Sequence, residues 1–323
     1  MTDTARKKIL EVKNLNQFFN QGKPNEVRAV NDLSFFIYEG ETFGLVGESG
    51  SGKSTTGKIV TKLQDATSGM IRFDGMDISH VKKRRDLLSF RKSVQMVFQD
   101  PYASLNPRKT VMEIIGGGLE VHGLVQSQAE KEAKVYELLK LVGLNPEYAT
   151  RYPREFSGGQ CQRVGIARAL AVNSSFIVAD EAISALDVSI QAQIVNLLKK
   201  LKEECNLTYL FIAHDLSMVK HISDRIGVMN GGRLLEVAPA DALYNYPLHP
   251  YTESLLSAVP LPDPERERNR KRITYDETYH EYADNSDVAL HEIAPEHYVY
   301  CSRQEIAFLK KKHQKNGTSN NEI

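Results

Sequence analysis

The sequence predicts an α/β fold with a parallel sheet, because short apolar runs alternate with helical patterns along much of the chain. Three runs have the length and the β-branched or aromatic content of buried strands: Val94–Phe98, Phe176–Ala179 and Leu207–Ala213. Between the last two, apolar residues recur at helical spacing at Ile190, Ile194, Leu197, Leu198 and Leu201. A strand, a helix and a strand in that order favour parallel pairing.

The remaining predicted elements divide the chain into three parts. Leu33–Tyr38 and Thr42–Val46 are predicted strands, and a glycine-rich turn separates the second from a predicted helix over Lys53–Leu63. From about residue 100 to 171 the pattern is mainly helical, which predicts a helical subdomain inserted in the α/β unit. Beyond residue 260, several prolines and the charge run Glu265–Arg272 predict a solvated linker and a small, partly irregular extension over 261–323.

Composition and charge argue against several classes of protein. Lysine plus arginine number 41, as do aspartate plus glutamate, so net charge gives no reason to expect a nucleic-acid partner. The three cysteines, Cys161, Cys205 and Cys301, form no CxxC pair, which argues against a disulfide scaffold and fits a reducing cytoplasm. No stretch reaches the roughly 18–20 apolar residues that cross a bilayer, and the amino terminus lacks the apolar core of a secretory signal.

A glycine-rich loop carries the strongest chemical signal. Gly47-Glu48-Ser49-Gly50-Ser51-Gly52-Lys53-Ser54 matches GxxxxGK[ST] and lies between a predicted strand and a predicted helix, with Thr55 following in the same helix. Glycines let backbone N–H groups turn toward phosphate oxygens, and the helix N-terminus adds positive charge. Lys53 is predicted to neutralise the β- and γ-phosphates of ATP, and Ser54 to ligate Mg²⁺.

Four polar residues stand where predicted strands end. Asp180 and Glu181 follow Phe176–Ala179, Gln99 follows Val94–Phe98, and His214 follows Leu207–Ala213. Because ligands of such sheets collect at the carboxyl ends of strands, we expect these side chains at one edge. Asp180 is predicted to hold Mg²⁺, Glu181 to orient or activate the attacking water, Gln99 to sense metal and water, and His214 to hydrogen-bond the γ-phosphate.

A second phosphate-cradling pattern lies about a hundred residues after the first. Phe156-Ser157-Gly158-Gly159-Gln160 enters a predicted helix that carries Arg163 and Arg168. One nucleotide has no obvious need of two cradles in one chain. A dimer resolves this, because each second cradle then faces the nucleotide of the partner.

Together these motifs resemble the nucleotide-binding subunits of ABC transporters. The resemblance covers about residues 8–240 and makes Gly47–Ser54 the Walker A motif, Gln99 the Q-loop, Phe156–Gln160 the signature and Phe176–Asp180 the Walker B motif. Ser184–Asp187 and His214 correspond to the D-loop and the switch histidine. It implies a nucleotide-binding domain over 1–260, ATP and Mg²⁺ as ligands, and a head-to-tail dimer that brings Ser157, Gly159 and Gln160 onto the partner's γ-phosphate.

Several longer stretches are similar to the F-type ATP-binding subunits of oligopeptide and dipeptide permeases: Val97–Arg108, Ser157–Leu170, Ser184–Gln193 and His249–Pro264. This similarity implies a second, different ATPase subunit, two transmembrane permease subunits and an extracytoplasmic peptide-binding protein, with this chain peripheral on the cytoplasmic face of the membrane. Residues Gln99–Arg108 are then expected to dock a cytoplasmic helix of a permease subunit.

The sequence departs from the family at two informative places. Ala182 stands where proline is usual, which is expected to loosen the turn after Glu181. Many relatives carry a cysteine-rich segment near their C-terminus, whereas here only Cys301 is present, so no iron–sulfur cluster is expected. For adenine stacking, the family uses an aromatic residue before the P-loop, and Phe19 is the first candidate with Phe18 as the second; core packing is the alternative for both.

Other functions remain open at this point. An importer of dipeptides or nickel would use the same kind of ATPase subunit, since the solute is selected by the other subunits of the transporter. A soluble ABC ATPase of DNA repair usually has a long coiled coil between P-loop and signature, and an ABC translation factor has two cassettes; this chain shows neither. A P-loop kinase would lack the Ser-Gly-Gly-Gln cluster, and an exporter half would carry a fused membrane span.

Overall fold

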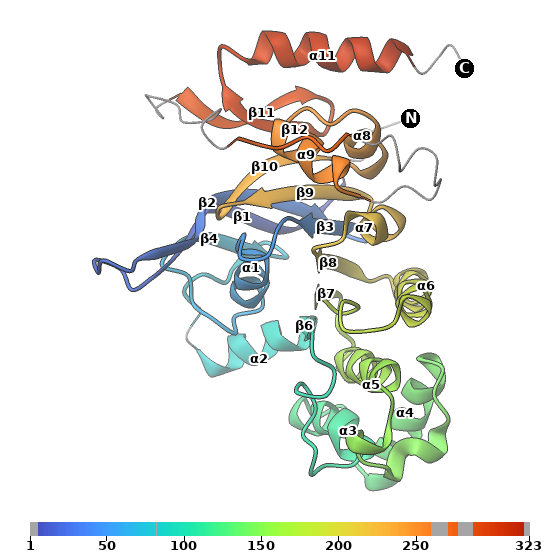
Figure 1. Ribbon diagram of the computed structural model, residues 1–323. Helices are drawn as coiled ribbons and strands as arrows, with labels where there is room; N and C mark the ends of the chain where they lie inside the picture. The colour runs from blue at the N-terminus through green and yellow to red at the C-terminus, as the bar shows by residue number, and fades with distance from the viewer. Residues whose placement is uncertain (1–5, 82, 260–270, 277–286, 320–323) are drawn as a thin grey trace, which may run out of the picture.

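The described residues form two β-sheets and a separate group of helices (Figure 1). The computed structural model describes residues 6–81, 83–259, 271–276 and 287–319. The larger sheet has eight strands in the order β11-β12-β10-β9-β3-β8-β7-β6. In chain order these are β3 (Thr42–Val46), β6 (Val94–Val97), β7 (Phe176–Asp180), β8 (Thr208–Ala213), β9 (Arg225–Asn230), β10 (Arg233–Pro239), β11 (Val288–Ala294) and β12 (His297–Ser302).

The central part of the larger sheet is parallel. Each neighbouring pair from β6 through β7, β8 and β3 to β9 runs in the same direction. Helix α6 (Val188–Cys205) connects β7 to β8, helix α7 (Leu216–Ile222) connects β8 to β9, and helix α1 (Lys53–Val60) follows β3. Helix α1 stops before the predicted end at Leu63, because Lys62 takes a left-handed conformation with φ of 54°. The predicted α/β class with a parallel sheet is confirmed.

A smaller antiparallel sheet packs against one face of the parallel strands. Its order is β2-β1-β4-β5, with β1 (Lys8–Phe19), β2 (Val27–Tyr38), β4 (Ser68–Phe73) and β5 (Met76–Asp77), and helix α2 (Arg84–Ser93) follows it. The two sheets share one apolar core, in which Phe35 stacks on Phe43 with ring centroids 5.4 Å apart. The sequence predicts β2 only from Leu33 onward, and it predicts neither the first half of β2 nor β1.

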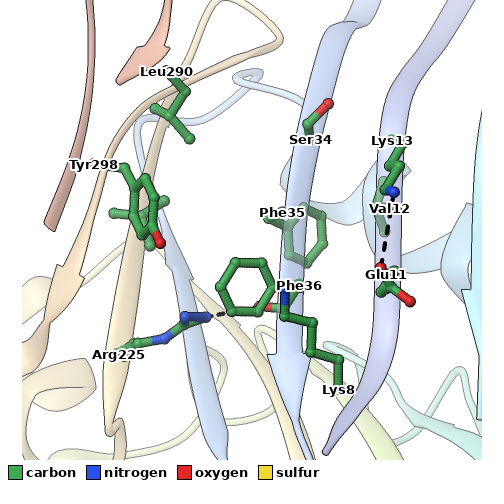
Figure 2. A pocket seen from close by; sticks show the side chains of 11 residues that line it. Lys8, Glu11, Val12, Lys13, Ser34, Phe35, Phe36, Arg225, Leu290 and Tyr298 are labelled. Carbon is green, nitrogen blue, oxygen red and sulfur yellow. Dashed lines mark hydrogen bonds and ion pairs between the residues drawn. The ribbon is translucent and has the colours of Figure 1, made fainter. Parts of the chain in front are cut away.

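A buried ion pair fixes the junction of the two sheets. Arg225 Nε of β9 donates to Glu41 Oε1 at 2.8 Å, and Arg225 Nη2 donates to the carbonyl oxygen of Phe36 at 2.8 Å. The guanidinium also lies 4.5 Å from the centre of the Phe36 ring. Figure 2 shows Phe36, Tyr298 and Leu290 around a neighbouring cavity of about 290 Å³, open between β2 and the C-terminal strands.

The helical group forms the far end of the molecule in Figure 1. It contains α3 (Val111–Val121), α4 (Gln128–Leu141), two short 3₁₀ helices (Pro146–Thr150 and Pro153–Glu155) and α5 (Gly158–Leu170). Thr110 and Ser127 cap α3 and α4, because their side chains accept the N–H of Glu113 and Glu130. Residues 100–171 are all described and none lies in a strand, as the periodicity predicts.

Within the C-terminal extension, the described strands join the main sheet. After α8 (Ala240–Asn245) and α9 (Pro250–Ser257), the hairpin β11–β12 pairs with β10, and helix α11 (Ile306–Ser319) covers it. Glu236 of β10 and His297 of β12 are both fully buried, and Glu236 Oε1 lies 2.7 Å from His297 Nε2. The charge run Glu265–Arg272 lies mostly outside the described residues.

Replacing Glu236 with alanine is expected to cost about 3–5 kcal/mol of unfolding free energy, because it removes one partner of a buried pair. The same carboxylate accepts the N–H groups of Leu248 and His249 at 2.8 and 3.0 Å, and these would also lose their acceptor. Urea denaturation measures the change, with exposed Glu137→Ala on α4 as the matched control. A loss for Glu236→Ala no larger than that of the control would contradict this role.

Candidate active site

The loop between β3 and α1 closes around the ammonium group of Lys53. Lys53 Nζ donates to the carbonyl oxygens of Gly47 and Glu48 at 2.8 and 2.7 Å, and to Ser51 Oγ at 3.2 Å. The residue is 3% exposed. Burial lowers the pKa of this amine, and the nearby carboxylates of Glu181, Asp180 and Glu48 partly oppose that shift. A buried cation of this kind is suited to receive phosphate.

The loop needs glycine for steric reasons at its last turn. Gly52 has a φ of 101°, and a Cβ there would lie 2.0 Å from the carbonyl oxygen of Ala29 on β2. A side chain is therefore excluded twice, by backbone conformation and by space. Gly52 is also the N-cap of α1, and no side chain caps that helix end. The N–H groups of the first turn, which includes Ser54 and Thr55, are thus open to an anion.

Ser54 and Asp180 meet across the sheet edge. Ser54 Oγ donates to Asp180 Oδ1 at 2.7 Å, although the residues are 126 positions apart in the chain. Asp180 is 5% exposed, and burial raises its pKa, while the Ser54 hydrogen bond and two lysines oppose the shift. A hydroxyl beside a carboxylate is a pair of hard oxygen donors, which suits Mg²⁺.

The carboxylate of Glu181 lies close to the side chains of Gln99 and His214, which follow two other strands. Gln99 Nε2 donates to Glu181 Oε2 at 2.7 Å, and His214 Nδ1 lies 3.7 Å from the same oxygen. The Glu181 side chain is 15% exposed, whereas that of His214 is 55% exposed. The structure therefore brings Gln99, Glu181 and His214 together at the carboxyl edge, as expected from the strand order.

The turn after Glu181 is closed without proline. Glu181 has a left-handed φ of 45°, and its N–H donates to the carbonyl oxygen of Ile212 at 2.9 Å. Ser184 donates its N–H and its hydroxyl to the carbonyl oxygen of Glu181, at 3.1 and 3.0 Å. Ala182 is 2% exposed. These hydrogen bonds from Ser184 hold the turn in which alanine stands in place of proline.

The second cradle lies at the start of α5. Ser157 Oγ accepts the N–H of Gln160 at 3.3 Å, and Gln160 Oε1 accepts the N–H of Ser157 at 2.9 Å, which forms a capping box. A Cβ on Gly159 would lie 2.6 Å from Ile190 Cγ2. Within the part of the chain that the structure describes, no hydrogen bond or ion pair joins Ser157, Gly159 or Gln160 to the loop at Gly47–Ser54.

The two aromatic candidates lie at the end of β1. Phe19 is 40% exposed and pairs with Val27 of β2. Val27 lies two residues before Ala29, whose carbonyl oxygen lies close to Gly52 of the loop. Phe18 is half-buried, and the Arg28 guanidinium lies 5.4 Å from its ring centre. The exposed fraction of Phe19 argues against core packing for this side chain.

Comparisons with known proteins agree with this geometry. The family model for ABC transporters matches residues 30–184, and the model for the C-terminal region of oligopeptide/dipeptide transporters matches residues 235–284. The oligopeptide transport ATP-binding protein OppF of Bacillus subtilis (strain 168) is 60% identical over 93% of this chain and 98% of its own length. The chain belongs to the ABC transporter family. The dipeptide transport ATP-binding protein DppF of Lactococcus lactis subsp. cremoris is 56% identical over 95% and 98% of the two chains.

Solved ABC structures share the fold. A dimeric bacterial ABC transporter cassette has a TM-score of 0.65 and 32% identity, and it covers 72% of this chain and 98% of its own. A second structure of the same cassette, dimeric in a post-hydrolysis state with ADP and Pi, has the same TM-score and 31% identity. As an ABC ATP-binding subunit, this chain binds ATP and is an ATPase coupled to transport. No helix in the described residues is long and apolar enough to cross a membrane.

Sequence reasoning missed one residue of this site. The hydroxyl of Tyr251, on α9, accepts the N–H of Glu48 in the Walker A loop at 3.3 Å. The two residues are 203 positions apart, so neither motif spacing nor periodicity points to the contact. The one sequence signal near Tyr251 is the segment His249–Pro264, which resembles peptide permease subunits but does not indicate this contact.

Proposed function

We propose that this chain powers the uptake of oligopeptides, as one of two different ATPase subunits on the cytoplasmic face of a pair of transmembrane permease subunits. An extracytoplasmic peptide-binding protein would deliver the substrate. The curated relatives named for oligopeptide transport support this choice, since they match almost the full length of the chain. Dipeptide transport is the second candidate, because a relative of similar identity carries that name.

One observation supports the proposal that two ATPase subunits work as a head-to-tail dimer. The Walker A loop and the signature each have the form of a phosphate cradle, yet the described residues hold no polar contact between them. A head-to-tail arrangement would bring Ser157, Gly159 and Gln160 of one subunit onto the γ-phosphate held by the other. The capping box at Ser157 already fixes this helix N-terminus, so little rearrangement would be needed there.

The nucleotide would be held by the residues of the Walker A loop. The loop Gly47–Ser54 and Thr55 would surround the phosphates with those backbone N–H groups that are not held by other protein groups, and Lys53 would exchange its carbonyl partners for phosphate oxygens. Phe19 would stack on the adenine. Ser54 and Asp180 would hold Mg²⁺ together with Gln99, whose amide oxygen stays available while Nε2 donates to Glu181. Bound Mg²⁺ would neutralise charge on the phosphate oxygens.

Glu181 would orient and activate the attacking water. Its carboxylate is largely shielded from solvent and is held by Gln99, which aims it from a second strand end. His214 is the more exposed partner and would turn toward the γ-phosphate. Hydrolysis would then remove the phosphate that joins the two cradles, and the dimer would open.

Residues Gln99–Arg108 would dock a cytoplasmic helix of a permease subunit, and a groove lined by the preceding Phe98 would extend that contact. The groove has a volume of about 320 Å³ and lies between α2, β6 and the helical group. Its lining includes Leu88, Phe98, Val121, Arg91 and His122. Val121 is 69% exposed, an uncovered apolar side chain at the rim. A cytoplasmic helix seated here would contact β6, which Gln99 follows by two residues, and so link the position of the permease to the catalytic edge.

Deleting the gene in its source organism and measuring solute uptake tests the proposal. We expect loss of uptake of a labelled pentapeptide, restored by the wild-type chain and not by Glu181→Gln. Labelled dipeptide and Ni²⁺ are measured in the same cells. Loss of dipeptide or nickel uptake with normal pentapeptide uptake would favour those solutes, and unchanged uptake of all three would contradict an importer role.

A further inference from the structure

We propose that Tyr251 is a positioning residue for the phosphate-binding loop, and that the C-terminal region holds it in place. Tyr251 lies in the first turn of α9 and is 3% exposed. Its hydroxyl accepts the N–H of Glu48 at 3.3 Å. The carbonyl oxygen of Glu48 accepts from Lys53 Nζ at 2.7 Å and from the N–H of Ser51 at 3.2 Å.

Glu48 is therefore held through both its backbone N–H and its backbone carbonyl oxygen. ATP binding would change only the contacts of the carbonyl oxygen. This inference rests on the proposed nucleotide site, in which Lys53 leaves the Glu48 carbonyl to bind phosphate. The Tyr251 hydroxyl does not take part in that exchange. It would keep the Glu48 amide fixed while the lysine moves, and thereby preserve the curvature of the loop in both states. Preorganisation of this kind lowers the entropic cost of binding.

Tyr251 is held through its backbone N–H and through its ring. His249 Nδ1 accepts the N–H of Tyr251 at 3.1 Å, which caps α9. The Tyr275 ring packs edge-on against the Tyr251 ring, with centroids 5.3 Å apart. The segment that carries Tyr275 is tied to α9, because Ser254 Oγ donates to the Ile273 carbonyl at 2.7 Å and Ser257 Oγ accepts the Ile273 N–H at 2.9 Å.

These contacts continue into the C-terminal hairpin. Glu236 accepts the N–H groups of Leu248 and His249 and also contacts His297 of β12. The start of α9 is thus anchored to the main sheet by a buried carboxylate. The C-terminal region does more than cover the sheet edge, because it sets the position of a hydroxyl that the nucleotide loop uses.

The test is Tyr251→Phe in the full-length chain, which removes the hydroxyl and keeps the ring. We expect the Kd for ATP to rise about 2- to 10-fold, the fold-change that corresponds to one hydrogen bond. Hydrogen–deuterium exchange of the peptide covering residues 47–53, measured without nucleotide, should become faster. Tyr209→Phe is the matched control, because the Tyr209 hydroxyl is buried and has no hydrogen-bond partner among the described residues.

The outcomes separate this proposal from the proposed function. Wild-type Kd together with wild-type exchange in Tyr251→Phe overturns the positioning role and leaves the ATPase intact. Failure of the wild-type chain to bind ATP overturns both. If the variant unfolds at a lower temperature than the control, hydrogen–deuterium exchange in the folded protein still distinguishes a positioning role from a purely structural one. A purely structural loss would speed exchange throughout α9 and β10, and not selectively in residues 47–53.

Discussion

Replacing Glu181 with glutamine is expected to lower kcat for ATP hydrolysis by about 10²- to 10⁴-fold, the usual contribution of a general base, and to leave ATP binding intact. Glutamine has the same shape and keeps one oxygen that can accept from Gln99, which now lies 2.7 Å from Glu181 Oε2. The variant loses the negative charge and the proton acceptor. Phosphate release and ATP titration, performed on the same preparation, measure the two effects separately.

The control for this variant is Glu203→Gln, an exposed residue on α6 that undergoes the same change of charge. It should hydrolyse ATP at the wild-type rate. The Glu181→Gln variant should also accumulate as an ATP-bound dimer, because binding persists while the step that opens the dimer is blocked. Hydrolysis within about threefold of wild type would remove Glu181 from its proposed role.

Replacing Lys53 with alanine should weaken ATP binding by about 2–5 kcal/mol, or roughly 30- to 5,000-fold in Kd. The buried ammonium group offers the phosphates a positive charge, and no other residue of the loop carries one. The fold should tolerate the change, because burial lowers the pKa of Lys53 and so opposes keeping the charge in the empty loop. Isothermal titration with ATP measures the change in Kd.

Lys199→Ala, on the exposed side of α6, is the matched control and should bind ATP like the wild type. Thermal unfolding without nucleotide should give similar midpoints for the two variants. If Lys53→Ala bound ATP as tightly as Lys199→Ala, the loop at Gly47–Ser54 would not be the phosphate site. A strong loss of stability in the absence of ATP would instead show that the Lys53 hydrogen bonds mainly maintain the fold.

The parts of the molecule that sequence predicts best depend on local signals. Strand β3 has its predicted bounds, Thr42–Val46, and α1 begins at the predicted Lys53, because an apolar run, a glycine turn and a helical pattern adjoin there. The co-location of Gln99, Glu181 and His214 also follows from sequence, since parallel strands place their carboxyl ends at one edge.

The parts that sequence did not predict depend on pairing between distant segments. Strand β11 has only one buried position, and the buried positions of β12 include His297, so their apolar pattern is weak. Their place in the sheet comes from the pairing of β12 with β10 and of β11 with β12. Long β1 contains register shifts that interrupt its alternation. The Tyr251–Glu48 contact joins residues 203 positions apart, and no local rule connects them.

Truncation of this protein before β11 and β12 would remove the hairpin that pairs with β10. A chain ending near residue 260 would retain every nucleotide motif, yet β10 would become an outer strand with unpaired backbone groups, which readily recruit strands of other molecules. Glu236 would at the same time lose His297. Such a fragment would be expected to self-associate, and low solubility in it would reflect an open sheet margin and not a defect of the catalytic half.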